Sequence, residues 1–212
     1  MISRMKVEDL TIEQRGTPLE EADKVLIMLH GRGDNAKSFI NLSNAFELSD
    51  YAILALQADN NTWYPFSFLA KIENNQPNLS NSLQYIDTLV GHLETNGFQS
   101  HRIYLCGFSQ GACLTLEYAT RNAKKYGGII AFTGGLIGEK LDLSKYKGDF
   151  EGTYVFIGSS DHDPHVPEYR INDSETIITN LGGNVKKIIY KGMGHTINQD
   201  EINEAKKLLN KQ

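Results

Sequence analysis

Short apolar runs alternate along this chain with longer segments whose apolar residues recur every three or four positions. Six of the runs are typical of β-strands, and continuous apolar runs are expected where helices cover both faces of a sheet. They lie at residues 25–29, 51–56, 102–106, 128–133, 153–157 and 185–190. The helical patterns lie at residues 36–46, 79–96, 112–126, 170–181 and 199–210. Strands that alternate with helices pair in parallel, so we expect an α/β fold with a mostly parallel central sheet and helices on both faces.

Length and composition narrow the class of protein further. The chain has 212 residues, and we expect residues 1–212 to form a single domain. Its 21 basic and 26 acidic residues leave a net charge of −5, which argues against nucleic acid or an anionic membrane surface as the main partner. No stretch approaches the roughly 20 apolar residues of a membrane span, and residues 1–10 lack the apolar run of a signal peptide. The two cysteines do not indicate a disulfide framework, so a reducing, cytoplasmic setting is expected.

A G-x-S-x-G motif, Gly107-Phe-Ser-Gln-Gly111, lies between a predicted strand and a predicted helix. In that context the serine occupies a sharp, strained strand-to-helix turn, and the flanking glycines allow neighbouring backbone to come close. Its hydroxyl then faces the crevice beyond the carboxyl ends of the strands, where open α/β sheets bind ligands. Ser109 is therefore the candidate nucleophile, with an ordinary helix N-cap as the alternative interpretation.

A serine hydroxyl becomes a good nucleophile only when a base accepts its proton, and a carboxylate usually orients that base. In this fold the three residues follow one another in the order serine, acid, histidine. Asp161 and Asp163 both follow the strand predicted at 153–157, and His195 follows the strand predicted at 185–190. These positions lie at the carboxyl ends of strands, the same edge as the nucleophile. The pattern predicts a catalytic triad in which, from spacing alone, either aspartate can be the acid.

Four ordered motifs make the chain resemble the phospholipase/carboxylesterase family of α/β-hydrolases, which includes the acyl-protein thioesterases. They are His30-Gly-Arg-Gly-Asp34, Gly107-Phe-Ser-Gln-Gly111, Asp163-Pro-His-Val-Pro167 and Gly192-Met-Gly-His195. The resemblance runs from about residue 25 to the C-terminus and implies an α/β-hydrolase fold. No segment between a strand and a helix is long enough for a separate lid domain. We therefore expect a minimal form of the fold in which only the loop at 57–78 can cover the site.

The resemblance assigns a role to each site residue. The aspartate before the proline is the family's triad acid, which selects Asp163. Ser109 is then the nucleophile, His195 is the general base and acid, and Asp163 orients the imidazole. Two backbone N–H groups would stabilise the oxyanion. One belongs to Gln110, which follows the nucleophile, and the other, by resemblance, belongs to Arg32.

The chain departs from the family pattern at two places. Arg32 stands where eukaryotic members usually carry leucine, and its guanidinium either lies solvated or faces the site and favours substrates with an anionic group. Trp63 matches a tryptophan of the family, but Pro65 replaces the acid that usually follows. Four aromatic residues of the loop at 57–78 either wall an acyl pocket or only pack, namely Trp63, Tyr64, Phe66 and Phe68.

Other polar and sulfur-bearing side chains have simpler interpretations. His162 and His165 flank the triad acid, and we interpret them as loop histidines because no further ligands complete a four-ligand metal site. His30 is expected to hold its own loop through hydrogen bonds. Cys106 and Cys113 lie on either side of the nucleophile and are expected to be buried core thiols.

These residues predict a serine hydrolase that cleaves carboxylic esters or thioesters of small to medium acyl chains through an acyl-enzyme. Such chemistry needs neither a metal nor another cofactor, and its partner is a small-molecule substrate. Two alternatives stay open: a lactone hydrolase similar to dienelactone hydrolases, which use a cysteine nucleophile, and a catalytically silent, ligand-binding relative. The aromatics of the 57–78 loop also leave open a homodimer. A fold does not confer an activity, so the prediction rests on the site.

Overall fold

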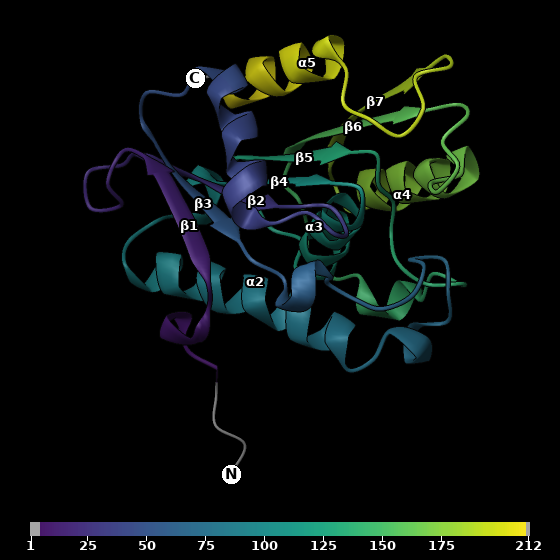
Figure 1. The fold of residues 1–212 in the computed structure, drawn as a ribbon, viewed down its shortest axis with the longest axis horizontal. Coiled ribbons are helices and arrows are strands. Elements are labelled where there is room, and N and C mark those ends of the chain that lie inside the picture. Colours follow the sequence, from purple (N-terminus) through teal and green to yellow (C-terminus); the bar gives the residue numbers. More distant parts are fainter. Residues whose placement is uncertain (1–4, 211–212) are drawn as a thin grey trace.

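A computed structural model describes residues 5–210 and places seven strands in one sheet (Figure 1). The strands are β1 (Ile12–Gly16), β2 (Lys24–Leu29), β3 (Tyr51–Leu56), β4 (Ile103–Phe108), β5 (Gly128–Phe132), β6 (Tyr154–Ser160) and β7 (Asn184–Tyr190). Their order across the sheet is β1-β3-β2-β4-β5-β6-β7. Strand β1 pairs antiparallel with β3, and every other pair is parallel. The prediction of a mostly parallel sheet is therefore confirmed.

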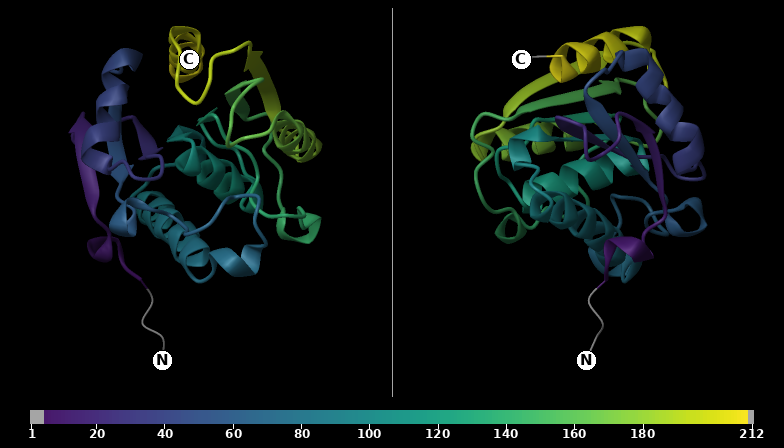
Figure 2. Two further views of the ribbon diagram at one scale, coloured as in Figure 1. Left: turned by 45° about the vertical axis from the view of Figure 1, so that its right-hand side comes forward. Right: turned by 90° about the vertical axis from the view of Figure 1, so that its left-hand side faces the viewer.

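Helices cover both faces of this sheet, as Figure 2 shows. The α-helices of the described residues are α1 (Ala36–Phe39), α2 (Asn78–Thr95), α3 (Gln110–Arg121), α4 (Glu168–Asn180) and α5 (Gln199–Leu209). Short 3₁₀ turns occupy Val7–Asp9, Ile40–Phe46, Asp59–Asn61, Ile72–Asn75, Ser100–Arg102 and Leu143–Lys145. Helices α2, α3 and α4 pack on one face, while α1, the turn Ile40–Phe46 and α5 pack on the other.

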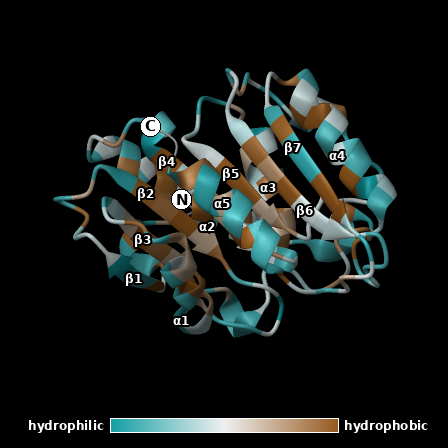
Figure 3. Cartoon of the chain, turned by 90° about the horizontal axis from the view of Figure 1, so that it is seen from above, coloured by the Kyte–Doolittle hydropathy of each residue, from teal (hydrophilic) through white to brown (hydrophobic). Residues whose placement is uncertain are grey.

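The two helical layers create two hydrophobic cores that share the strands. In β2, Val25 and Ile27 belong to the core beneath α2 and α3, whereas Leu26 and Met28 belong to the core beneath α1 and α5. Successive side chains of a strand point to opposite faces, so burial on both faces requires an unbroken apolar run. Figure 3 shows the result as hydrophobic central strands beneath helices with hydrophilic outer surfaces.

Strand β1 was not predicted from the sequence. Its residues Glu13, Gln14 and Arg15 are exposed, so it carries no apolar alternation that a sequence pattern could detect. The strand lies at the edge of the sheet and pairs with β3 alone. Charged residues are typical of such edge strands because they discourage pairing with another chain.

Two predicted helices are shorter than expected. Only Ala36–Phe39 of the predicted 36–46 helix is α-helical, and the rest is a 3₁₀ turn. There the Asn41 and Ser43 side chains donate to nearby backbone carbonyls, which competes with regular helix bonding.

The helix predicted at 112–126 ends at Arg121. Beyond it, the Ala123 N–H donates to the Lys147 carbonyl at 3.0 Å, and the Tyr126 N–H donates to Thr153 Oγ1 at 3.0 Å. Backbone groups that would continue the helix are thus satisfied by a distant segment instead. The other predicted helices and strands agree with the structure within a few residues, and α5 begins with a capping box between Asn198 and Glu201.

The parallel strands bring the loops that follow β2, β4, β6 and β7 to one edge of the sheet. These loops carry residues 30–34, 109–111, 163–167 and 192–195 of the four sequence motifs. In residues 5–210, no helix has both the length and the apolar composition to cross a membrane.

Candidate active site

Ser109 lies at the turn between β4 and α3, and its backbone conformation is one that L-residues rarely adopt. Its φ is 53° and its ψ is −116°, a strained geometry of the kind found at functional turns. Only glycine fits on either side. A Cβ on Gly107 would lie 2.4 Å from the Gly111 carbonyl oxygen, and a Cβ on Gly111 would lie 2.1 Å from the Leu29 carbonyl oxygen. The Ser109 N–H donates to the Phe132 carbonyl at 2.9 Å, which ties the turn to β5.

Two hydrogen bonds link Ser109, His195 and Asp163 in a chain. Ser109 Oγ lies 2.8 Å from His195 Nε2, and His195 Nδ1 lies 2.7 Å from Asp163 Oδ2. The other Asp163 oxygen accepts the backbone N–H groups of His165 and Val166 at 2.8 and 2.9 Å. The Asp163 side chain is fully buried, while that of His195 retains 22% exposure. The carboxylate is therefore fixed in place, and the imidazole keeps access to a substrate.

Asp161, the alternative acid, contacts a different loop residue. Its Oδ1 accepts the Gly192 N–H at 2.8 Å, and this hydrogen bond lowers the pKa of the Asp161 carboxyl. The neighbouring Ser160 Oγ accepts the Gly194 N–H at 3.1 Å. Together they hold the loop that carries His195. Sequence reasoning missed this role because each contact joins residues more than 30 positions apart, 31 and 34 respectively.

The backbone amides of Arg32 and Gln110 donate no hydrogen bond to any other residue between 5 and 210. Arg32 belongs to a tight turn in which the Asp34 N–H donates to the Gly31 carbonyl at 3.2 Å and Gly33 has a φ of 80°. Gln110 begins α3, and the first amides of a helix have no partner within the helix. Both amides are thus available to an external acceptor, as the oxyanion-hole prediction requires.

A cavity of about 580 Å³ lies beside Ser109 and His195. Tyr64, Phe66 and Phe68 line it. For these three residues the structure agrees with the alternative in which the loop aromatics wall a pocket. Phe66 is the most exposed of them, with 57% of its surface accessible. The loop therefore forms one wall of the cavity.

Trp63 does not line this cavity and instead packs behind it. The side chain is 1% exposed, its Nε1 donates to the His30 carbonyl at 2.8 Å, and its ring lies 5.1 Å from the His30 ring. The prediction that Trp63 is a pocket residue is therefore wrong, because its buried ring lies outside the lining of the cavity. The family tryptophan serves here to join the loop to the segment after β2.

The Arg32 side chain is exposed and lines the cavity, so it faces the site as one of the two alternatives expected. Three of its N–H bonds donate to backbone carbonyls of residues 64–66, which the sequence did not predict. The Arg32 backbone thus belongs to the turn after β2, while its side chain binds the loop at 57–78.

His30 holds its own loop, as expected. Its Nδ1 donates to the Gly31 carbonyl at 2.7 Å, and its Nε2 accepts the Ala58 N–H at 3.1 Å. Burial lowers the pKa of His30, which favours the neutral imidazole that this pairing needs.

The structure also shows where the two cysteines and the histidines near Asp163 lie. Cys106 and Cys113 are free and buried, which confirms the prediction of core thiols, and burial raises the pKa of both. His162 is exposed, whereas His165 lines the cavity with its ring 4.9 Å from that of His195. Within residues 5–210, no three His, Cys, Asp or Glu side chains are grouped as a metal site requires.

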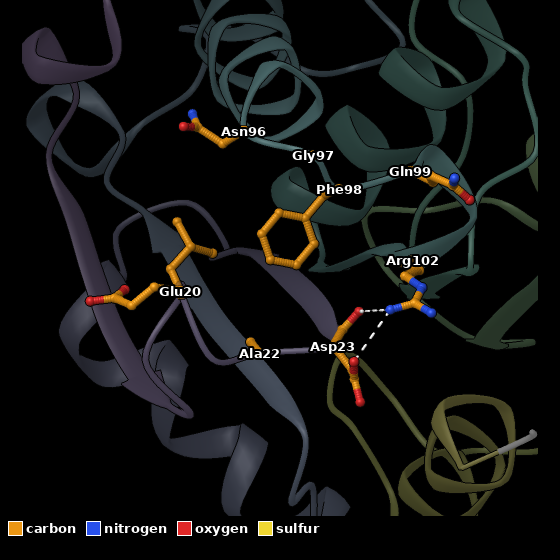
Figure 4. Close-up of a pocket in the computed structure, with 9 residues that line it drawn as sticks. Glu20, Ala22, Asp23, Asn96, Gly97, Phe98, Gln99 and Arg102 are labelled. Carbon is orange, nitrogen blue, oxygen red and sulfur yellow. Dashed lines mark hydrogen bonds and ion pairs between the residues drawn. The ribbon is translucent and has the colours of Figure 1, made fainter.

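A second cavity, of about 330 Å³, lies at the opposite edge of the sheet, beside the amino ends of β2 and β4 (Figure 4). Phe98 projects into it, and Arg102 pairs there with Asp23 at 3.3 Å. Its lining includes no serine, cysteine or histidine. Since open α/β sheets bind ligands at the carboxyl ends of their strands, the candidate site is the cavity beside Ser109.

The parallel sheet, the strained serine turn and the hydrogen-bonded serine, histidine and aspartate define an α/β-hydrolase fold. A model of the phospholipase/carboxylesterase family matches residues 13–212. A solved phospholipase/carboxylesterase from Dyadobacter fermentans superposes on the chain with a TM-score of 0.93 and 47% identity, covering 100% of this chain and 99% of that one. The chain therefore belongs to the phospholipase/carboxylesterase family.

Curated relatives include acyl-protein thioesterases 1 from fungi. The Gibberella zeae protein is 32% identical over 133 residues, which cover 62% of this chain and 57% of that protein. The Saccharomyces cerevisiae protein is 26% identical over 221 residues, which cover 91% of this chain and 94% of that protein. For the first of these, the match spans little more than half the relative's length.

Proposed function

We propose that the protein is a serine hydrolase that cleaves carboxylic esters or thioesters of small to medium acyl chains. The observation that carries the proposal is the hydrogen-bonded chain from Ser109 through His195 to buried Asp163, beside an apolar cavity. Membership of the phospholipase/carboxylesterase family supports the same chemistry.

In the first half of the reaction, Ser109 Oγ attacks the acyl carbon while its proton passes to His195 Nε2. The carbonyl oxygen becomes an oxyanion, which the amides of Arg32 and Gln110 stabilise by hydrogen bonds. His195 then gives the proton to the leaving oxygen or sulfur as its bond to carbon breaks. An alcohol or thiol departs, and the acyl group remains on Ser109 as an ester.

The second half reverses these roles with water. His195 Nε2 takes a proton from water as its oxygen attacks the acyl-enzyme, and the same oxyanion contacts form again. The proton then returns to Ser109 Oγ, and the carboxylic acid leaves. Asp163 accepts a hydrogen bond from His195 Nδ1 throughout, which keeps Nε2 free to accept protons and stabilises the imidazolium.

The cavity supports the proposed substrate range. Its volume of about 580 Å³ is within the range of small-molecule sites, and its walls are mainly aromatic and aliphatic. Free Cys106 and Cys113 agree with the expected reducing, cytoplasmic setting, which stays a prediction together with the single domain over 1–212 and the homodimer.

Hydrolysis of p-nitrophenyl esters from acetate to decanoate tests the proposal, with wild type beside Ser109→Ala. Removal of a triad nucleophile lowers kcat by as much as about 10⁶-fold, so the variant should be inactive. Ser144→Ala is the matched control, because Ser144 is an exposed serine on the turn Leu143–Lys145, and it should retain wild-type rates.

Other results would select the alternatives. Equal activity in wild type and Ser109→Ala would refute the nucleophile assignment. If both are inert, labelling with a serine-directed phosphonate decides: an unlabelled Ser109 indicates a silent ligand-binding relative. A labelled Ser109 directs the search to other substrates, with lactones tested first.

A further inference from the structure

The guanidinium of Arg32 binds three consecutive carbonyl groups of the aromatic loop. Its Nη1 donates to the Pro65 carbonyl at 2.8 Å, and its Nη2 donates to those of Tyr64 at 2.9 Å and Phe66 at 2.7 Å. Residues 63–66 bend, so the three carbonyls converge on one side chain. The guanidinium meets them with N–H bonds from two nitrogens of a rigid planar fork, a geometry that the single nitrogen of a lysine ammonium does not reproduce.

The same loop is held from its other side by Gln110. Gln110 Oε1 accepts the Trp63 N–H at 3.0 Å, and Gln110 Nε2 donates to the Tyr64 carbonyl at 2.7 Å. Arg32 and Gln110 are also the two residues whose backbone amides have no hydrogen-bond partner in residues 5–210 and are predicted to form the oxyanion hole. Each therefore offers its backbone to the proposed oxyanion and its side chain to residues 63–66, which couples the oxyanion hole to the wall of the cavity.

Phe66 is the wall residue that this arrangement positions most directly. Its carbonyl accepts from Arg32, and its N–H donates to Oδ1 of the fully buried Asn75 at 2.8 Å. Both polar groups of the Phe66 backbone are thus hydrogen-bonded, although the residue is 57% exposed and lines the cavity. These backbone contacts therefore determine where the exposed Phe66 stands in the wall.

We propose that Arg32 is a positioning residue that sets acyl-chain selectivity by holding Phe66 against the cavity. The proposal rests on the proposed esterase function. Three of its five N–H bonds are engaged by carbonyls of residues 64–66, so Arg32 acts on the wall of the site.

The first test compares kcat and KM of Arg32→Leu, Arg32→Lys and wild type on p-nitrophenyl acetate, butyrate and octanoate, and on a p-nitrophenyl ester whose acyl chain ends in a carboxylate. Loss of the wall should lower kcat/KM for octanoate by roughly tenfold or more, the scale of discrimination by an apolar pocket, and should change acetate least. Arg32→Lys should resemble Arg32→Leu, because it keeps the charge and loses the planar donor.

Arg15→Leu is the matched control. Arg15 is an exposed arginine on β1 that donates to Asn41 and Asn44, remote from the cavity. It should leave the chain-length profile unchanged. The proposal is overturned if Arg32→Lys behaves as wild type, if all three esters lose activity equally, or if the loss is confined to an ester that carries a carboxylate.

Phe66→Ala provides a second arm. If Arg32 acts through this ring, Phe66→Ala should itself reduce the preference for octanoate, and adding Arg32→Leu should reduce it no further. Additive losses in the double variant would place the effect of Arg32 elsewhere and refute the proposal.

Trp63 gives a readout that needs no activity. It is the single tryptophan of the chain, it is 1% exposed, and its backbone belongs to the held segment. Arg32→Leu should shift its fluorescence emission to longer wavelength and increase quenching by acrylamide, whereas Arg15→Leu should not. Should wild type hydrolyse none of these esters, phosphonate labelling of Ser109 decides the proposed function, while Trp63 separately reports whether Arg32 holds the loop. Unchanged fluorescence in Arg32→Leu would show that it does not.

Discussion

Replacing the buried Glu201 by glutamine should remove the pH dependence that this carboxyl gives to the stability of the fold. Glu201 lies in the first turn of α5, where its Oε2 accepts the Asn198 N–H at 2.8 Å. Its Oε1 has no hydrogen-bond partner in residues 5–210, and a Cβ on Gly158 would lie 2.2 Å from it. Burial, with a smaller contribution from the nearby charge of Asp200, raises the pKa of Glu201 to about 7.

The sign follows from the proton count. Between the ordinary pKa of 4.5 and the raised value, the folded protein binds a proton that the unfolded chain has released, so stability is greatest below this range and falls as pH rises through it. A difference of about 2.5 pKa units corresponds to roughly 3 kcal/mol at about 1.4 kcal/mol per unit. From pH 5 to pH 8 the expected change is roughly 2–3 kcal/mol.

Urea unfolding of wild type and Glu201→Gln at pH 5, 6, 7 and 8 measures this change. The free energy of unfolding of the variant relative to that of wild type should increase by roughly 2–3 kcal/mol across the range. Glu204→Gln is the control, because Lys186 and Lys207 lower the pKa of Glu204 and keep it ionised above pH 5. The difference in free energy of unfolding between Glu204→Gln and wild type should therefore stay nearly constant from pH 5 to pH 8. A constant difference for Glu201→Gln as well would refute the reasoning.

Further substitutions test the site and its supporting turns. Asp163→Asn should lower kcat on p-nitrophenyl butyrate by roughly 10⁴-fold, because the imidazole loses the acceptor that selects its tautomer. Asp161→Ala should lower the same kcat much less, on the order of tenfold, because it loosens only the loop that carries His195. A larger loss of kcat than that of Asp163→Asn would overturn the choice of Asp163 as the acid. Gly111→Ala should lower the free energy of unfolding by about 1–3 kcal/mol or more in urea titration, because its Cβ would meet the Leu29 carbonyl, and a neutral result would contradict that close approach.

Much of the fold was predictable because its signals are local. The central strands carry unbroken apolar runs that record burial on both faces, and Ser109 lies within a five-residue motif between a strand and a helix. The positions of Asp163 and His195 followed from the rule that parallel strands bring their carboxyl ends together. Strand β1 escaped detection because an exposed edge strand has no apolar pattern to read.

The choice of side-chain partners needed the tertiary structure. Asp161 and Asp163 follow the same strand, and spacing alone left both open; the family resemblance selected Asp163, and the distances show that it is the one hydrogen-bonded to His195. Trp63 and Phe66 belong to one aromatic segment, yet one packs behind the cavity and the other forms its wall.

By itself, then, the sequence determined the α/β architecture, the strained serine turn and the edge of the sheet where the chemistry lies, because each depends on hydrogen bonding and side-chain periodicity within a few residues. Only the tertiary structure decided that Arg32 holds the aromatic loop and that Glu201 is buried without a cation. These contacts join segments tens of residues apart, such as the 32 to 34 positions between Arg32 and its acceptors. Packing of the whole chain, which no local pattern encodes, brings such segments together.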